Sequence, residues 1–408
     1  MNESDKTVTL FSCPNCTDGI MEIFHRAEGV PTNSCILMAS RPEALEYPRG
    51  NIKLGFCRDC GFVGNTAFDP VLTEYSGRYE ETQGFSPTFR KFHQGLANRL
   101  VEQFDLADRD ILEIGCGKGE FLLMLCADGR NRGVGYDPGY RSDRHAAAPG
   151  ENVSFVADFY TDKTVAAAAD FVCCKMTLEH IPRTLDFMTM VRQAQGDRPA
   201  DIFFMIPEAT RILQDCAFED VYYEHCSYFS PHSLEVAFRE AGFFPTAIGN
   251  EYDGQYLTIA ASTEDRGTGP LTDGQELERL KGWVRSFPDR FQRQVDFWQD
   301  RLGRLKAADK VTVIWGSGSK GVSFLSTLGL TDEIMGAVDI NPHRQGYFMP
   351  GSGHRIFGPD DLVSLQPDAV IIMNPIYRDE IAADLAKLGL TPEIMTIDDG
   401  IQKQGGTS

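Results

Sequence analysis

The chain has 408 residues, more than one ordinary domain holds, and this length predicts two or three domains. Hydrophobic residues make up 42% and charged residues 24%, a globular balance that excludes disordered, collagen-like and coiled-coil classes. The net charge of −20 disfavours nucleic acid and anionic lipid as partners, and no apolar run is long enough to predict a membrane span. The first residues lack a basic patch followed by an apolar stretch, so we expect no signal peptide and a cytoplasmic location.

Two Cys-x-x-Cys pairs open the chain, Cys13 with Cys16 and Cys57 with Cys60. Each pair places two thiolates on one side of a tight turn, and two such turns supply four sulfurs for a tetrahedral zinc ion. Residues 1–66 are too few to bury an adequate core, which a closed metal site compensates. The spacing therefore predicts a first domain, 1–66, with a structural zinc site; four buried or redox-active cysteines are the alternative.

The most informative stretch follows an apolar strand that ends at Glu113 and Ile114. Glycines let the backbone turn sharply and approach a ligand closely, and three of them alternate here before an apolar helix begins. These are Gly115, Gly117 and Gly119. A second strand ends at Asp137, where a carboxylate accepts both hydroxyls of a ribose. A dinucleotide fold uses glycine spacings of two and then three to seat a pyrophosphate, whereas this loop reads Gly-x-Gly-x-Gly. A Rossmann-like sheet without a cofactor is a further alternative.

The loop resembles the nucleoside-binding loop of class I S-adenosylmethionine-dependent methyltransferases. The resemblance implies an α/β domain over 67–265 with a seven-stranded sheet. It places Glu113 toward the cofactor's ammonium group and Asp137 toward its ribose. Asp158 and the adjoining Phe159, at the end of the third strand, are expected at the adenine. The later strands of such a sheet are expected at 170–176, 201–207, 243–249 and 255–261.

The segment 222–225 crowds ionisable and phenolic side chains just before a helix expected from about Ser230. Methylation of carbon requires removal of a proton beside a carbonyl, and a histidine, here His225, titrates near the operating pH. Tyr222 and Glu224 are suited to hold an enolate or orient the imidazole. Alternatively, His225 lines the pocket of an O- or N-methyltransferase without accepting a proton.

With zinc pairs upstream and another domain downstream, this segment resembles the three-domain C-methyltransferases that act on nucleotide-linked keto-deoxysugars. The resemblance implies that His225 is the base and that Glu224 and Tyr222 assist it. It also implies a tyrosine over the cofactor in the polar and aromatic stretch 75–86, where Tyr75 and Tyr79 qualify. We assign Tyr75 to the cofactor and Tyr79 to the catalytic group; a solvated linker is the alternative.

The last part of the chain predicts a helical linker, 266–308, and a Rossmann-like α/β domain, 309–408. Apolar spacing in the linker predicts two helices with a kink at Pro288, because proline cannot continue the helical hydrogen-bond ladder. After the linker, the pattern of a strand, a glycine loop and a helix occurs for a second time in the chain. Lys320 in this second glycine loop is a candidate ligand of a substrate phosphate. Relatives often read Lys-Gly-Asn-Thr at this point, whereas this chain reads Lys-Gly-Val-Ser, so the departure concerns the substrate rather than the fold.

Together these patterns predict an S-adenosylmethionine-dependent C-methyltransferase that acts beside a carbonyl of a small, nucleotide-linked keto-sugar. The competing hypotheses are an O- or N-methyltransferase of another metabolite and a zinc-containing binding or scaffold protein without activity. The intact set of acids, Glu113, Asp137 and Asp158, favours an active enzyme.

Overall fold

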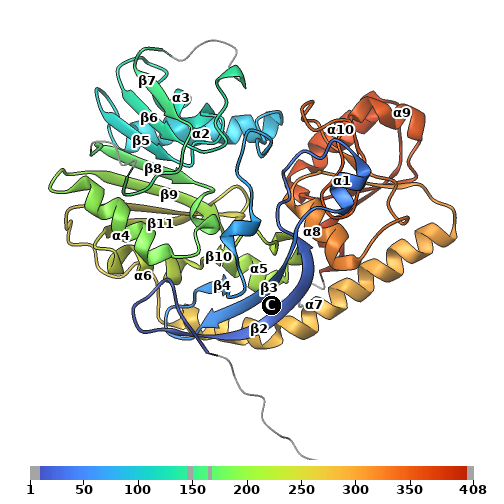
Figure 1. Cartoon of the computed structure of the whole chain (residues 1–408), viewed down its shortest axis with the longest axis horizontal. Helices are drawn as coiled ribbons and strands as arrows, with labels where there is room; N and C mark the ends of the chain where they lie inside the picture. The colour runs from blue at the N-terminus through green and yellow to red at the C-terminus, as the bar shows by residue number, and fades with distance from the viewer. Residues whose placement is uncertain (1–9, 145–149, 164–167, 402–408) are drawn as a thin grey trace, which may run out of the picture.

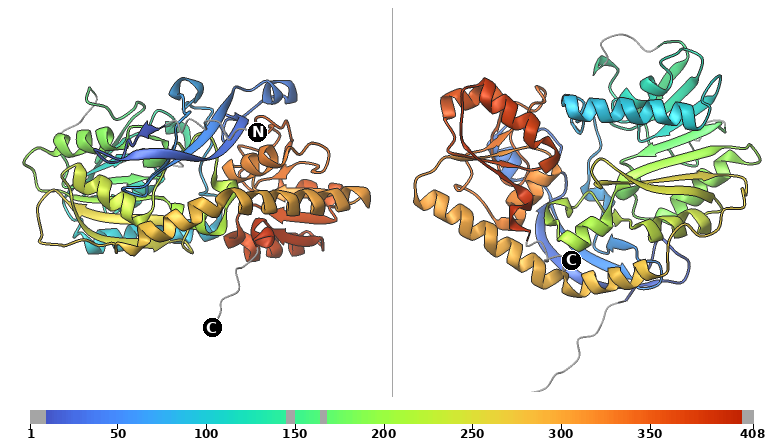
Figure 2. Two further views of the ribbon diagram at one scale, coloured as in Figure 1. Left: turned by 90° about the horizontal axis from the view of Figure 1, so that it is seen from below. Right: turned by 180° about the vertical axis from the view of Figure 1, so that it is seen from behind.

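The computed structural model describes residues 10–144, 150–163 and 168–401, which form three sheets. Figure 1 shows the seven-stranded sheet on one side, the C-terminal unit on the other, and the N-terminal strands between them at the base. Helix α7 (Gln275–Ala307) runs along this base from the central unit to the C-terminal unit, as both views of Figure 2 show. Among the described helices, none combines the length and apolar character needed to cross a membrane.

The N-terminal sheet is antiparallel, in the order β1-β2-β3-β4-β10. Its N-terminal elements are β1 (Phe11–Ser12), β2 (Ile20–Pro31), α1 (Arg41–Leu45), β3 (Arg49–Cys57) and β4 (Val63–Asn65). The fifth strand, β10 (Ser227–Tyr228), comes from far along the chain, and Ser227 pairs with Gly64 while Tyr228 pairs with Val63. The segment that contains His225 is therefore fixed directly to the N-terminal sheet.

The central sheet has seven strands in the order β11-β12-β9-β8-β5-β6-β7, which confirms the predicted fold class. Its strands are β5 (Asp110–Ile114), β6 (Arg132–Tyr136), β7 (Val153–Val156), β8 (Phe171–Lys175), β9 (Asp201–Pro207), β11 (Phe244–Glu251) and β12 (Tyr256–Ser262). Its helices are α2 (Pro87–Gln103), α3 (Glu120–Leu125), α4 (Thr184–Gln195), α5 (Ala209–Asp215) and α6 (Pro231–Glu240). Strands β5 to β9 are parallel, and β12 and β11 complete the sheet as antiparallel strands. The order reverses at β5, so a ligand crevice is expected at the carboxyl ends of β5, β6 and β8.

Successive apolar side chains along the buried strands point to opposite faces of the central sheet, so the core is divided into two layers. Ile111 and Phe171 pack with α2 and α3, whereas the adjacent Leu112 and Val172 pack with α4 and α6. Successive side chains in a strand point to opposite faces, and helices cover both faces here, so β8 is buried at all five positions. The sheet is thereby a rigid base for the loops at its edge.

The C-terminal sheet is wholly parallel, in the order β15-β14-β13-β16-β17. Its elements are β13 (Thr312–Trp315), α8 (Ser319–Leu328), β14 (Ala337–Val338), β15 (Ile356–Phe357), α9 (Leu362–Leu365), β16 (Ala369–Ile372), α10 (Arg378–Lys387) and β17 (Glu393–Thr396). Ile314 packs with α7 and α8 on one face, and Val313 packs with α9 and α10 on the other. The sequence predicted β13, β14 and β16, and the structure adds the two short edge strands.

The predicted pair of helices around Pro288 is wrong, because α7 is one helix across 33 residues. Proline removes only one backbone N–H donor from the helix. Near Pro288, polar side chains donate hydrogen bonds to a backbone carbonyl of the preceding turn. The carbonyl of Trp283 accepts from the guanidinium of Arg290 at 2.9 Å and from the hydroxyl of Ser286 at 3.2 Å. Phe287, fully buried, also packs this part of α7 against the N-terminal sheet and α5. Packing of Phe287 and these side-chain hydrogen bonds one residue away hold the turn together, so the helix continues past Pro288.

Candidate active site

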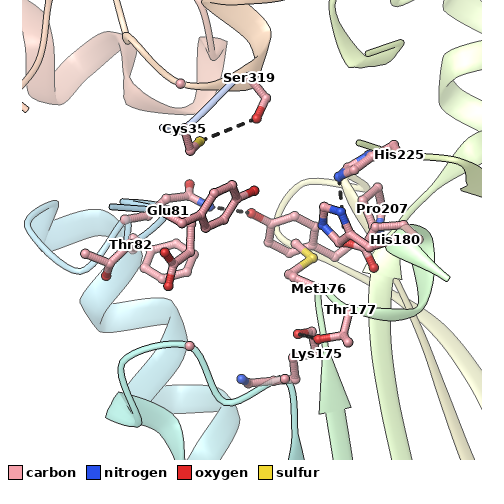
Figure 3. Close-up of a pocket in the computed structure, with 18 of the residues that line it drawn as sticks. Cys35, Glu81, Thr82, Lys175, Met176, Thr177, His180, Pro207, His225 and Ser319 are labelled. Carbon is pink, nitrogen blue, oxygen red and sulfur yellow. Dashed lines mark hydrogen bonds and ion pairs between the residues drawn. The ribbon is translucent and has the colours of Figure 1, made fainter. Parts of the chain in front are cut away.

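A cavity of about 520 Å³ lies between the central sheet and the C-terminal sheet, where the carboxyl ends of their parallel strands face each other. The loops after β5, β6 and β8 line one side, and the loops after β13, β14 and β16 line the other. Cys35 adds a contact from the N-terminal unit, and Figure 3 shows it with Ser319 across the cavity from Lys175. All three parts of the chain thus contribute to one chamber.

The predicted glycine loop forms a tight cradle beside this cavity. A Cβ at Gly115 would lie 1.8 Å from Oγ1 of Thr177, and φ is +71° there, so only glycine is accommodated without strain. Asp137 closes the loop, because its two carboxylate oxygens accept from the backbone N–H of Gly117 at 2.9 Å and of Gly139 at 2.7 Å. Burial raises the pKa of Asp137. Each carboxylate oxygen has a second lone pair, so the side chain remains able to accept from a ligand hydroxyl.

Glu113 is buried and forms an ion pair with Lys175, whose Nζ lies 2.7 Å from Oε1 of Glu113. Lys175 lines the cavity and also lies over the ring of Phe121, 4.0 Å from its centre, whereas Glu113 is not among the lining residues. One carboxylate oxygen of Glu113 is thus paired with the ammonium group of Lys175, and the other has no hydrogen-bond partner, so the expected role of Glu113 at the cofactor's ammonium group stays a prediction. Nothing in the local sequence indicated this pairing.

Four other predicted residues meet around the same cavity. Asp158 and Phe159 line it, and Oδ1 of Asp158 accepts from the backbone N–H of Phe159 at 2.7 Å. The rings of Tyr75 and Tyr79 lie 5.3 Å apart, and the ring of Phe159 lies 6.5 Å from that of Tyr75. The hydroxyl of Tyr75 is 2.8 Å from Nδ1 of His180. The stretch 75–86 therefore folds onto the cavity, where the sequence left a solvated linker as the alternative.

His225 is buried and lines the cavity with Tyr222, whose hydroxyl lies 2.8 Å from Nε2 of the imidazole. The ring of His180 is 4.9 Å away in an edge-on arrangement, and Figure 3 shows both histidines on the same side of the cavity. Burial lowers the pKa of His225 well below its ordinary value, and the nearby His180 and Lys320 act in the same direction. A neutral imidazole next to a phenol is the form that accepts a proton.

Glu224 is buried and bonded mainly to the N-terminal unit. Its carboxylate accepts from Nδ2 of Asn33 at 2.9 Å, from the backbone N–H of Ser34 at 2.8 Å and from the hydroxyl of Ser34, and it is also bonded to Tyr79. Its assistance to His225 stays a prediction. The carboxylate paired with His225 in the described residues is that of Glu179, at 3.9 Å. Glu224 instead holds the N-terminal unit and Tyr79 against the active-site segment.

Lys320, the candidate phosphate ligand, lines the cavity from the first turn of α8, and its contact with a phosphate stays a prediction. Its ammonium group is paired with Asp220, which also pairs with Arg211. Burial and the charge of Arg211 lower the pKa of Lys320 to about 7. The sequence gave no indication of Arg344, a buried guanidinium in the same part of the cavity that donates to Oγ of Ser317 at 3.2 Å.

The four paired cysteines converge away from this cavity, on the α4–α6 face of the central sheet. The sulfurs of Cys13 and Cys60 are 3.7 Å apart, and those of Cys16 and Cys57 are 3.8 Å apart. A tetrahedron of Zn–S bonds of about 2.3 Å has edges of about 3.8 Å, so the donor set fits zinc. A Cβ at Gly19 would lie 2.5 Å from two of these sulfurs, so the backbone closes tightly over the cluster.

Comparisons with known proteins agree with this geometry. Residues 88–247 match the methyltransferase domain family, and residues 274–391 match the C-methyltransferase C-terminal domain. The chain is 25% identical over 330 residues to the C-methyltransferase NovU of Streptomyces niveus. The aligned region covers 75% of this chain and 76% of that relative.

Solved structures resemble part of the chain. One is the magnesium protoporphyrin IX methyltransferase of Synechocystis PCC 6803 with bound SAH, with 14% identity, a TM-score of 0.34, and coverage of 43% of this chain and 84% of that chain. Another is the N,N-8-amino-8-demethyl-D-riboflavin dimethyltransferase of Streptomyces davawensis, with 18% identity, a TM-score of 0.35, and coverage of 42% and 55%.

The seven-stranded sheet and the cradle at its switch point define a class I methyltransferase. With its C-terminal C-methyltransferase domain and its relative, the chain is an S-adenosylmethionine-dependent methyltransferase of the C-methyltransferase type.

Proposed function

We propose that the enzyme methylates a carbon next to a carbonyl in a nucleotide-linked keto-sugar, with His225 as the base. One observation carries this proposal: a buried neutral imidazole, 2.8 Å from the hydroxyl of Tyr222, faces the chamber between the cofactor loop and the second glycine loop. A proton acceptor of this kind is required for a carbon nucleophile and is dispensable for many heteroatom acceptors.

The residues around the first glycine loop fit the cofactor. Gly115 and Gly119 form a cradle in which a Cβ would clash, and Asp137 keeps lone pairs that can accept from a ribose hydroxyl. We propose that Asp158 and Phe159 lie along the adenine and that Tyr75 covers the cofactor. When bound, S-adenosylmethionine supplies a methyl group on a positively charged sulfur.

The protein's own part in the reaction is to remove and hold a proton. The C–H bond next to the substrate carbonyl breaks, the proton moves to a ring nitrogen of His225, and the electron pair forms the enolate whose carbon accepts the methyl group. Tyr222 orients the imidazole through the bond at Nε2, and Tyr79 fixes the chamber wall through Glu224.

The second glycine loop supports a nucleotide on the substrate. It follows β13 at the carboxyl edge of the C-terminal sheet and leads into α8, and helix N-termini favour anions. Lys320 and the buried Arg344 add two cationic groups to an otherwise strongly acidic chain. We propose that a phosphate competes with Asp220 for Lys320 on binding.

The test is the variant His225→Asn, with His232→Asn as the matched control. His232 lies in α6, where its Nδ1 contacts Thr272, and it does not line the cavity. The first variant should lower kcat about 100- to 10,000-fold and leave cofactor affinity by calorimetry within about twofold. The control should retain activity. Mass spectrometry of ligands that co-purify with the protein identifies the substrate, and NMR of the product locates the methyl group. Turnover retained in His225→Asn, or a methyl group on oxygen or nitrogen, would refute the proposal.

We also propose that the four cysteines bind one structural zinc ion. The sulfur spacing supports this, and Asn15 donates its backbone N–H to Sγ of Cys13 at 3.4 Å, as expected for a thiolate. Metal analysis of the purified protein should give one zinc per chain, and Cys57→Ser should lose it, whereas Cys216→Ser should not. None of the eleven cysteines forms a disulfide, and we propose a cytoplasmic location, where reducing conditions keep cysteines in this state.

A further inference from the structure

Glu179 is a buried carboxylate that no sequence motif assigned. It lies in the short helix η3 (Leu178–His180) after β8 and lines the cavity with 2% of its surface exposed. Neither carboxylate oxygen has a hydrogen-bond partner. Its ion-pair partner among the described residues is Nε2 of His225, at 3.9 Å. A buried polar group without partners is costly, so its presence at this position calls for a functional reason.

Other buried acids around the cavity are paired or hydrogen-bonded. Glu113 is bonded to Lys175, Glu224 to Ser34, and Asp220 to Lys320. Glu179 differs from each of them because its one ion-pair partner among the described residues, His225, is a neutral group that gains charge during the proposed reaction. The arrangement therefore matches a need that arises when His225 is protonated.

Among the described residues, Glu179 forms no ion pair with a lysine or arginine. The titratable groups near it are phenols, thiols and an imidazole: Tyr75, Tyr222, Tyr256, Cys174, Cys226 and His180. Burial raises the pKa of each phenol and thiol and lowers the pKa of His180 to about 4, so all six are neutral near pH 7. Burial also raises the pKa of Glu179 itself to about 8. Lys320 acts on His225, where it opposes protonation.

We propose that Glu179 is the positioning residue of the catalytic base and the counter-ion of the imidazolium that His225 becomes. This inference rests on the proposed function. The substrate C–H bond breaks, its electron pair forms the enolate, and the proton binds a ring nitrogen of His225. The pair changes from carboxylate and neutral imidazole to carboxylate and imidazolium, so it ends without net charge in a site that disfavours charge.

This role has a pH signature, because the pair accepts a proton only after Glu179 has lost its own. Activity should therefore rise with pH through the ionisation of Glu179. In Glu179→Gln that ionisation is absent, so its rise near pH 8 should be lost, while any contribution of Lys320, whose pKa is about 7, remains the same in both proteins. A residue needed only for folding would lower activity equally at every pH.

The experiment compares Glu179→Gln and Glu179→Asp with the full-length wild type, with Glu276→Gln as control. Glu276 is a buried carboxylate outside the cavity, which accepts from the backbone N–H of His232 at 3.0 Å. The imidazole of His225 is followed by NMR titration without substrate, assigned by its loss in His225→Asn. In the wild type the imidazole signals of His225 should shift near pH 8 as Glu179 ionises; Glu179→Gln should abolish this step, whereas Glu179→Asp should retain one and Glu276→Gln should change nothing.

The second readout is the pH profile of kcat/KM at saturating cofactor, with a nucleoside diphosphate 4-keto-6-deoxyhexose as probe. Glu179→Gln should lose at least about tenfold in kcat and should lose the rise with pH, with KM nearly unchanged. An unchanged NMR titration of His225, or a wild-type pH profile in Glu179→Gln, would overturn the inference. Methylation of a heteroatom would instead refute the proposed function, and the substrate-free titration would still decide whether the pair is coupled.

Discussion

The buried ion pair behind the glycine loop makes a quantitative prediction. Glu113 has no exposed surface, one of its oxygens is 2.7 Å from Nζ of Lys175, and the other has no hydrogen-bond partner. Lys175→Met keeps the length of the side chain and its contact with Phe121 but leaves the carboxylate of Glu113 without a charged partner in the core. Breaking a buried pair in this way costs about 3–5 kcal/mol.

The double variant Lys175→Met with Glu113→Gln removes both charges and keeps the volumes. It should be destabilised by only about 1–2 kcal/mol, since no unpaired buried charge remains. Urea unfolding followed by circular dichroism measures all four proteins of this cycle. The reasoning predicts that the double variant is more stable than Lys175→Met alone.

The pH dependence gives an independent check. Burial raises the pKa of Glu113 even beside Lys175, and without that lysine it must rise further. When the pKa of a carboxyl is higher in the folded than in the unfolded protein, the protein becomes less stable as the pH rises. The loss of unfolding free energy in Lys175→Met relative to the wild type should therefore grow from about pH 5 to 8. The argument is refuted if the destabilisations of the two single variants simply add, or if the deficit is independent of pH.

Three further predictions concern the cradle, the base and the cysteines. Gly115→Ala forces a Cβ into Thr177, so cofactor affinity by calorimetry should fall at least about tenfold; unchanged affinity would contradict the cradle. Tyr222→Phe removes the bond to His225, and kcat should fall about five- to tenfold at nearly constant cofactor affinity; an equal loss in cofactor affinity would contradict a role in orienting the base. Removal of metal by a chelator should lower the melting temperature and abolish activity together, because the segment of His225 leads into a strand of the N-terminal sheet; activity retained without metal would contradict this coupling.

Local patterns were sufficient for much of this protein. The glycine spacing after an apolar strand predicted the cofactor loop, because a sharp turn and a close approach to a ligand depend on neighbouring residues only. The same holds for the strand-end acid Asp137 and for the cysteine turns, whose geometry is set within four residues. Strand and helix order then predicted the seven-stranded sheet.

Contacts between distant segments were decided by the tertiary structure. The sequence grouped Glu224 with His225 because they are neighbours, but consecutive side chains diverge, and Glu224 turns to Ser34. Glu179 reaches His225 because η3 packs on β10, and Lys175 reaches Glu113 because β5 and β8 are adjacent in the sheet. Pairing of strands and packing of domains set these distances, and no spacing along the chain encodes them. The sequence by itself thus determined the fold class and the cofactor loop, and the packed chain alone determined which charged groups meet at the base.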